Sequence, residues 1–158
     1  MTPGINIAKK AKISYKIHEY THDPANESYG SEAAEKMGVP EDRVFKTLVV
    51  SLDDKDLAVG VVPVSSMLNM KLIAKAAGAK KASMAAAADV ERTTGYVLGG
   101  VSPLGQKKRL KTIIDATAET FSTIYVSAGR RGLQIELSPT DLKNLTNGTF
   151  VAICQQDH

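Results

Sequence analysis

Two long runs of strand-forming residues stand in the middle of the chain. Residues 44–52 and 57–64 are rich in Val, Leu and other residues typical of strands, and the polar residues 53–56 separate them. This pattern predicts a β-hairpin. Residues 13–17 alternate between apolar and polar side chains, which indicates a half-exposed strand. Further strands are expected at residues 112–114, 122–127, 132–137 and 149–154.

Short helices are predicted between these strands from their start and stop signals. Thr2 and Pro3 are favoured at the beginning of a helix. Ile5, Ala8 and Ala11 then give that helix one buried apolar face. Glycine ends a helix well, because it adopts positive φ without strain. Further helices are expected from Ser31 to Gly38, from 70 to 77 before Gly78, from 85 to 92 before Gly95, and from Ser138 onward.

The order of these elements predicts an α+β domain. Hairpins and short helices are mixed without the regular alternation of a doubly wound sheet, so we expect a mixed, curled, barrel-like sheet flanked by short helices. A length of 158 residues suits one hydrophobic core, and we expect a single domain over residues 1–158. With no Trp and only three Phe, that core is expected to be aliphatic.

Composition and charge limit the classes of function. No segment approaches the roughly 20 apolar residues of a membrane span, and the N-terminus lacks the apolar run of a signal peptide. We therefore expect a cytoplasmic protein without a membrane partner. The single cysteine, Cys154, excludes a disulfide framework and a cysteine-based zinc site, and is expected to be a buried structural thiol. Net charge is only +3, but cations cluster at 9–12, 80–81, 107–111 and 130–131, which is typical either of phosphate contacts or of solvated surface.

The segment 95–109 combines glycines with cations. Gly99, Gly100 and Gly105 allow backbone angles closed to other residues. Pro103 stiffens the middle of the segment, so free amides can converge on one ligand atom. A surface turn followed by a solvated basic segment explains the same residues equally well. A dinucleotide-binding loop does not, because Pro103 and the β-branched residues beyond it argue against the long helix that such a loop requires.

Two short catalytic motifs match by letter and conflict with the predicted structure. His18 and His22 complete an HExxH motif, which binds zinc only on a helix. In the predicted strand the two imidazoles lie roughly 13 Å apart, so we expect no metal site. Ser102 stands one residue away from a serine-hydrolase elbow, but Pro103 lacks the amide that this elbow needs for its oxyanion hole. We expect the Ser102 hydroxyl to hydrogen-bond within its turn or to touch a ligand.

Lys46 is an unusual residue for its place in the predicted strand 44–52. It shares one face with the apolar residues Val44, Leu48 and Val50. A lysine at a strand edge can cover apolar surface with its stem while its ammonium group reaches water. Alternatively, Lys46 lies in a pocket and binds a carbonyl, carboxylate or phosphate oxygen.

The chain resembles the YbaK family of aminoacyl-tRNA deacylases, and the resemblance spans nearly its whole length. The shared segments are FKTL at 45–48, TGY at 94–96, GGVSPLG at 99–105 and IYVSAG at 124–129, with the opening MTP, the turn YTHDP at 20–24 and QKKRL at 106–110. The resemblance implies the fold of that family, which is related to the editing domain inserted in bacterial prolyl-tRNA synthetases.

The resemblance also implies roles for individual residues. Lys46 matches the essential lysine of the family, and the loop 99–103 matches its backbone-amide clamp around the aminoacyl ester. Gln134 departs from the family, in which close relatives often carry an acid. The residues implied in catalysis are Lys46, Gly99, Gly100, Val101 and Ser102. Those implied in substrate binding are Tyr20, Tyr29, Thr47, Pro103, Ser127, Ala128 and Gly129, with Lys107, Lys108, Arg109, Arg130 and Arg131 as contacts to tRNA phosphates.

The implied function is trans-editing without a cofactor. The substrate would be mischarged Cys-tRNA(Pro), with Cys-tRNA(Cys) as a second candidate and prolyl-tRNA synthetase as a partner. The residues above offer no protein nucleophile and no general-base pair. The resemblance implies that the thiol of the substrate attacks its own ester instead. Two alternatives stay open. One is a deacylase for another small residue, such as alanine on tRNA(Pro), with water as nucleophile. The other is a noncatalytic adaptor that binds tRNA or a synthetase.

Overall fold

The computed structural model describes residues 1–26 and 28–155, so residues 27 and 156–158 of the expected domain lie outside the described residues. The helices of this part of the chain are α1 (Pro3–Ala11), α2 (Tyr29–Met37), α3 (Met70–Ala76), α4 (Ala87–Thr94) and α5 (Pro139–Thr146), with 3-10 turns at Glu41–Arg43 and Ala116–Thr120. Its strands are β1 (Tyr15–Glu19), β2 (Phe45–Leu52), β3 (Asp56–Pro63), β4 (Ala82–Met84), β5 (Lys111–Asp115), β6 (Ile124–Arg130), β7 (Leu133–Leu137) and β8 (Thr149–Val151).

The larger sheet is built on the hairpin that the sequence predicts. Strands β2 and β3 pair antiparallel, and the sheet runs in the order β4-β2-β3-β5-β8. The connecting turn places Asp53 and Asp54 at positive φ, 53° and 55°. The Asp53 carboxylate accepts hydrogen bonds from the amides of Lys80 and Lys81, just before β4. β4 was not predicted, because three residues in an alanine-rich segment give no clear alternation.

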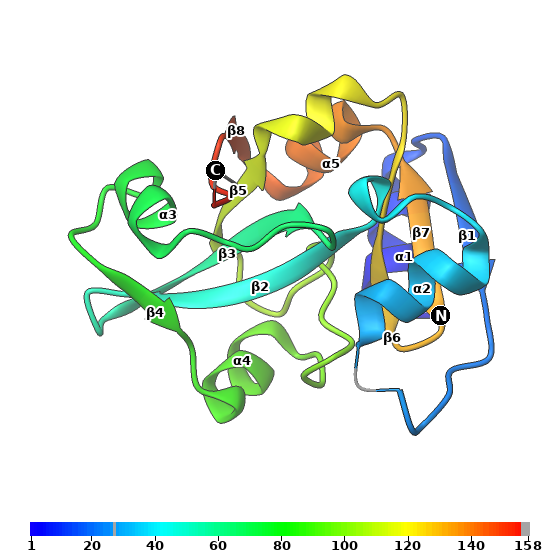
Figure 1. The fold of residues 1–158 in the computed structure, drawn as a ribbon, viewed down its shortest axis with the longest axis horizontal. Coiled ribbons are helices and arrows are strands. Elements are labelled where there is room, and N and C mark those ends of the chain that lie inside the picture. The colour runs from blue at the N-terminus through cyan, green and yellow to red at the C-terminus, as the bar shows by residue number, and fades with distance from the viewer. Residues whose placement is uncertain (27, 156–158) are drawn as a thin grey trace.

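The smaller sheet has the order β1-β7-β6, and both of its strand pairs are antiparallel. An isolated parallel bridge between Val44 and Tyr125 connects the entrance of β2 to β6, so the two sheets meet at this point. Figure 1 shows the sheets side by side, with β2 running toward the smaller one. The α+β class is confirmed. Over the described residues the strands form two open sheets, and neither is closed into a barrel.

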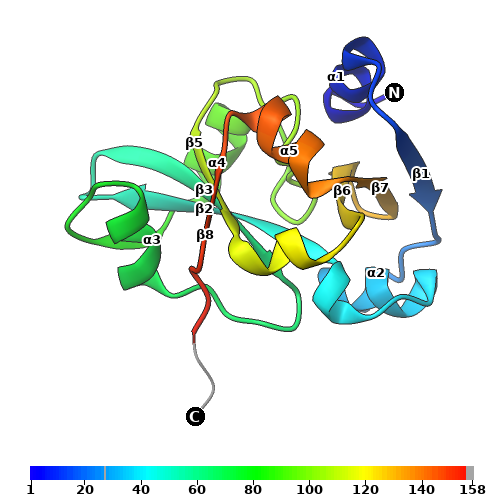
Figure 2. The ribbon, with the colours of Figure 1, turned by 90° about the horizontal axis from the view of Figure 1, so that it is seen from above.

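Helices α1 and α2 cover opposite faces of the smaller sheet. In Figure 1, α2 lies in front of β6 and β7 and α1 lies behind them, and Figure 2 separates the two helices in the same way. The Thr2 hydroxyl caps α1 as predicted, by accepting a hydrogen bond from the Ile5 amide. Helix α2 begins at Tyr29, slightly earlier than predicted, and ends at Gly38 with φ 69°. Ala11 is exposed, contrary to the prediction, and the buried face of α1 consists of Gly4, Ile5 and Ala8 in its first two turns.

Apolar side chains pack on both faces of the larger sheet. One buried cluster joins the two sheets and includes Val49, Val61 and Ile135, while a second lies under α3 and includes Ile73. Aliphatic residues dominate both clusters, as the composition predicts. None of the helices in the described ranges has both the length and the apolar character that crossing a bilayer requires.

Cys154 lies beyond β8, which ends at Val151 and is shorter than predicted. Its side chain is partly exposed rather than fully buried, and its backbone forms an isolated bridge to Leu68. Burial still raises the pKa of the Cys154 thiol to about 12, and the nearby Asp115 carboxylate acts in the same direction. The thiol is therefore protonated at neutral pH and is a poor nucleophile.

Candidate active site

A cavity of about 400 Å³ opens where the two sheets meet. Its walls come from the first turn of α2, the start of β2, the loop after α4, and the β6–β7 hairpin. Only the fold brings these four segments together. The lining residues are Tyr20, Ser28, Tyr29, Gly30, Ser31, Val44, Phe45, Lys46, Thr47, Leu48, Val64, Leu98, Gly99, Val101, Ser127, Arg130, Arg131 and Gln134.

Lys46 reaches the cavity from β2, where its backbone pairs with Val62 of β3. Its side chain is partly buried. No carboxylate among residues 1–26 and 28–155 lies within ion-pair distance of its ammonium group. A cation without a carboxylate partner is available to bind an oxygen of a ligand. The location of Lys46 therefore agrees with the pocket interpretation, while its catalytic role stays a prediction.

The glycine loop forms the wall that shares the cavity with Lys46. Gly99 has φ 92°, and a Cβ atom added there would lie 2.9 Å from Cε2 of Tyr29 and 2.9 Å from Nη2 of Arg131. Gly99 and Val101 both line the cavity, and over the described residues neither of their amides donates a hydrogen bond. Two unbonded amides therefore belong to this wall, as an oxyanion site requires.

Gly100 differs from its predicted role in the loop. Its φ is not positive, and its amide donates to the carbonyl of Val97 at 2.9 Å, so it is not free for a ligand. Gly100 is buried and does not line the cavity. Glycine is nevertheless needed here for a close approach, because a Cβ atom would lie 3.0 Å from Cα of Arg130.

Ser102 and Pro103 lie behind the loop rather than at the cavity surface. Both are buried, and neither lines the cavity. The Ser102 hydroxyl accepts a hydrogen bond from the Leu104 amide at 3.1 Å, which confirms the predicted bond within the turn. Leu104 in turn accepts from the Tyr96 hydroxyl at 2.5 Å, so these residues brace the loop from inside.

Of the three residues expected in the opposite wall, only Ser127 is a lining residue. Ala128 is fully buried and its carbonyl accepts from the Thr2 hydroxyl of α1, while Gly129 packs against Thr2 and Tyr96. A register shift between Ser127 and Arg130 turns this part of β6 away from the cavity. The shift could not be predicted from the even apolar pattern of the strand.

Tyr20, Tyr29 and Thr47 all line the cavity, as the resemblance implies. Burial raises the pKa of Tyr20, which keeps its hydroxyl protonated at neutral pH. Within the described part of the chain, Oγ1 of Thr47 and Oε1 of Gln134 are enclosed and have no hydrogen-bond partner. Unsatisfied polar atoms at a cavity are typical of a ligand site.

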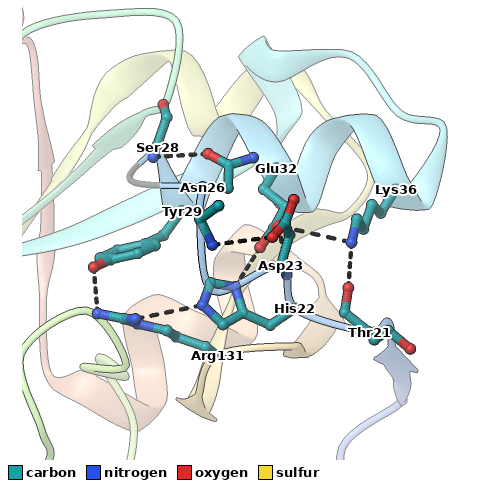
Figure 3. Close-up of polar contacts among 10 residues, drawn as sticks. Thr21, His22, Asp23, Asn26, Ser28, Tyr29, Glu32, Lys36 and Arg131 are labelled. Carbon is teal, nitrogen blue, oxygen red and sulfur yellow. Dashed lines mark hydrogen bonds and ion pairs between the residues drawn. The ribbon is translucent and has the colours of Figure 1, made fainter.

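Arg130 and Arg131, which were expected to contact tRNA phosphates, both line the cavity. The guanidinium of Arg131 stacks on the Tyr29 ring, 3.6 Å from the centroid, and donates to the Tyr29 hydroxyl. Figure 3 shows this arginine between Tyr29 and His22. The other predicted phosphate contacts, Lys107, Lys108 and Arg109, are exposed and do not line the cavity. Sequence reasoning also missed the first turn of α2, where only Tyr29 was singled out.

The two histidines of the HExxH motif bind different carboxylates. His18 lies in β1, as predicted, and its Nε2 is 2.9 Å from Glu136 of β7. His22 lies beyond the strand, and its Nδ1 is 2.5 Å from Glu32 of α2. The motif therefore does not bring its imidazoles to a common ligand.

The described lining of the cavity is basic and lacks the usual catalytic side chains. Lys46, Arg130 and Arg131 supply three cations. No carboxylate, imidazole or thiol occurs among the described residues that line it. Such a site attracts an anionic substrate and can stabilise negative charge, but it cannot activate a serine or water through a carboxylate–histidine pair.

Comparisons with known proteins agree with this geometry. The family described as "Aminoacyl-tRNA editing domain" matches residues 23–145. A protein of Enterococcus faecalis (strain ATCC 700802 / V583), named "Putative Cys-tRNA(Pro)/Cys-tRNA(Cys) deacylase EbsC", is 40% identical over 156 residues, which cover 99% of this chain and 94% of that protein. A proline–tRNA ligase of Trichlorobacter lovleyi is 29% identical over 98 residues, covering 62% of this chain and 17% of the ligase.

One solved structure shows the same fold. It is described as "a putative trans-editing enzyme for prolyl tRNA synthetase", and it superimposes with a TM-score of 0.79 at 22% identity. The match covers 90% of this chain and 87% of that one.

Proposed function

Because this chain belongs to the aminoacyl-tRNA editing domain family, we propose that it is a trans-editing deacylase that releases cysteine from Cys-tRNA(Pro). Membership confirms the resemblance of the sequence to the YbaK family. The observation that carries the proposal is the shared cavity of Lys46 and the unbonded amides of Gly99 and Val101. This arrangement suits an ester whose carbonyl oxygen gains negative charge during the reaction.

The nucleophile in this proposal is the thiol of the substrate. Its sulfur forms a bond to the ester carbon, the bond from that carbon to the ribose oxygen breaks, and the thiol proton ends on the ribose oxygen. Water then opens the resulting four-membered thiolactone to free cysteine. Intramolecular attack lowers the activation free energy by roughly 7 kcal/mol or more, because the thiol and the ester are already held together in one molecule. This explains how a cavity whose described lining offers no activated nucleophile can still accelerate deacylation.

The protein orients the ester and stabilises its charge. The amides of Gly99 and Val101 would donate to the developing oxyanion, a contribution of about 3 kcal/mol for each well-placed donor. Lys46 would hold the ester or the oxygens of the terminal adenosine. Gly100, Ser102, Pro103, Ala128 and Gly129 would act from behind this surface, by fixing the backbone of the loop and of β6.

The tRNA would be bound mainly through its phosphates. Arg130 and Arg131 stand at the cavity, where the last phosphate of the acceptor end would enter. Lys107, Lys108 and Arg109 are exposed and would contact the tRNA further from the ester. Contacts of this kind carry little sequence information, so tRNA(Pro) would be selected with the help of prolyl-tRNA synthetase in the cytoplasm.

A panel of charged tRNAs tests the proposal. The purified protein is incubated with Cys-, Ser- and Ala-tRNA(Pro) and with Cys-tRNA(Cys), with and without prolyl-tRNA synthetase, and release of each amino acid is followed. We expect rapid release of cysteine and at least about 100-fold slower release of serine, which has the same shape but no thiol. Comparable release of serine refutes thiol assistance, and faster release of alanine indicates a water-dependent alanine deacylase. Binding without any turnover indicates an adaptor.

A further inference from the structure

A chain of polar contacts connects a buried carboxylate to the cavity. Glu32, in the first turn of α2, is only 1% exposed, and it accepts from Nδ1 of His22 at 2.5 Å and from the amide of Asp23 at 2.9 Å. Nε2 of His22 lies 3.4 Å from Nη1 of Arg131, and Nη2 of the same guanidinium donates to the Tyr29 hydroxyl. Figure 3 shows these side chains in one row, with His22 between Glu32 and Arg131.

The partners of His22 fix the position of its proton. A carboxylate only accepts hydrogen bonds and a guanidinium only donates them. His22 therefore satisfies Glu32 and Arg131 together only as the neutral tautomer, with its proton on Nδ1 and a lone pair on Nε2. Burial opposes the charge of Glu32, but the bonds from His22 and from the Asp23 amide prevail and lower the pKa of its carboxyl, so Glu32 is an acceptor at neutral pH.

The far end of this row forms part of the cavity wall. Arg131 and Tyr29 both line the cavity and both pack against Gly99, whose amide has no acceptor in the described part of the chain. Arg131 is exposed, and an exposed arginine otherwise samples many rotamers. The stacking on Tyr29 and the contact with His22 restrict it to one place beside the glycine loop.

We propose that His22 and Glu32 are positioning residues that hold Arg131 and Tyr29 against the glycine loop, and that protonation of Nε2 of His22 releases Arg131. The inference rests on the proposed function, because the anion that Arg131 binds is taken to be a phosphate of the aminoacyl-tRNA acceptor end. Acid would therefore weaken substrate binding rather than slow the chemical step.

The charged groups around His22 support this direction. Glu32, Lys36 and Tyr29 face it from α2, Arg131 faces it from the β6–β7 turn, and Asp23 follows it in the chain. Lys36 is 3.7 Å from Glu32 and is held there by a bond to the Thr21 carbonyl. A second proton on His22 keeps the Glu32 contact but turns Nε2 into a donor that faces another donor. The contact with Arg131 is the one that fails.

Four variants test this inference through the kinetics of Cys-tRNA(Pro) deacylation between about pH 5 and 8, the range in which imidazoles titrate. In His22→Asn the amide nitrogen replaces Nδ1, so Glu32 keeps a donor while Arg131 loses its acceptor. We expect this variant to raise KM about tenfold with little change in kcat, as for loss of one charge-assisted contact. Arg131→Gln should do the same, and the double variant should be no worse than Arg131→Gln alone.

His18→Asn is the matched control, because His18 also pairs with a carboxylate, but its side chain packs on Tyr125 and not on Arg131 or Tyr29. The wild type and His18→Asn should share a rise of KM in acid that His22→Asn and Arg131→Gln lack. Titration of the substrate's amino group affects all four proteins equally and cancels in their ratios. Additive effects of His22→Asn and Arg131→Gln, or an unchanged KM in His22→Asn, overturn the inference.

NMR spectroscopy tests the tautomer of His22 and its contact with Arg131 without any measurement of activity. In long-range ¹H–¹⁵N spectra of the wild type at neutral pH, His22 should show the Nδ1–H tautomer, and Arg131→Gln should shift its Nε2 resonance. An Nε2–H tautomer, or an Nε2 signal indifferent to Arg131→Gln, overturns the inference even if the enzyme is active. If the wild type fails to deacylate any charged tRNA, the proposed function is wrong. The spectra then still test whether His22 and Glu32 hold Arg131 in place.

Discussion

At the residue scale, Gly99 shows how much of the site depends on backbone rather than on side chains. Its φ of 92° is strained for any other residue, and the space where a Cβ atom would stand is occupied by Tyr29 and Arg131. Its amide has no acceptor among the described residues. Glycine at position 99 therefore allows the positive φ of the loop and also leaves room for the Tyr29 and Arg131 side chains to pack against it.

Gly99→Ala is expected to lower kcat for cysteine release about 100-fold, because displacement of the loop removes an oxyanion donor. Gly78→Ala is the matched control. Gly78 has φ 77° after α3 and nothing within 4 Å of an added Cβ atom, so it adds similar strain without a clash. Gly78→Ala should lose about 1 kcal/mol of folding stability in urea denaturation, and Gly99→Ala should lose more because its Cβ also meets Tyr29 and Arg131. Equal activity of the two variants contradicts the role given to Gly99.

From the sequence, Lys46 and the glycine loop could be identified as parts of the site. Which residues of the loop have free amides and which bond within the protein could not. The letters of residues 99–103 suggested a continuous clamp. In the structure the Gly100 amide donates a hydrogen bond to the Val97 carbonyl, and the Ser102 hydroxyl accepts one from the Leu104 amide. Such choices depend on which carbonyl lies within reach after folding, and no local pattern encodes them.

At the element scale, the smaller sheet is held together by a polar cluster on one face. Glu136 of β7 accepts from the Thr123 hydroxyl at 2.6 Å and contacts His18 of β1 at 2.9 Å. Arg43 stacks on Tyr125 of β6 at 5.2 Å from the ring centroid and donates to the Thr123 carbonyl. These contacts tie β1 to the β6–β7 hairpin, which lies far from it in the sequence.

The acid stability of this cluster follows from Glu136. Burial opposes its charge, but the bonds from Thr123 and His18 prevail and lower its pKa below the ordinary 4.5. The stabilisation is therefore present above about pH 4.5 and is lost as pH falls through the lower folded-state pKa. Glu136→Gln should cost about 1 kcal/mol at pH 7, and the difference from the wild type should shrink near pH 3.

Urea denaturation at the two pH values measures this effect, with Glu35→Gln as the control because Glu35 is exposed on α2. A stability difference for Glu136→Gln that stays constant between the two values would contradict the assignment of the lowered pKa to its charge.

The elements themselves were largely predictable, because strong local signals define them. The hairpin of β2 and β3 followed from two β-rich runs and a polar turn, and α2 ended at Gly38 as expected. β4 was missed because it is a strand only by its pairing with β2. The parallel bridge from Val44 to Tyr125 was equally hidden, since it joins segments about 80 residues apart.

At the scale of the whole molecule, the site exists only where the two sheets meet. Lys46 comes from the larger sheet, Ser127 and Gln134 come from the smaller one, and the loop after α4 closes the space between them. A basic cavity with no carboxylate among its described lining residues favours a polyanionic substrate. A small rearrangement of the sheets would therefore separate the ammonium group from the amides, even with every residue unchanged.

The central claim is that Lys46 and the loop amides act on the same acyl bond, and single-turnover release of cysteine from Cys-tRNA(Pro) tests it most directly. Wild type is compared with Lys46→Ala and with Lys55→Ala, which removes an exposed lysine from the turn of the same hairpin. We predict that Lys46→Ala stays folded and loses at least about 100-fold in rate, while Lys55→Ala matches the wild type. Wild-type release by a folded Lys46→Ala variant would contradict the account.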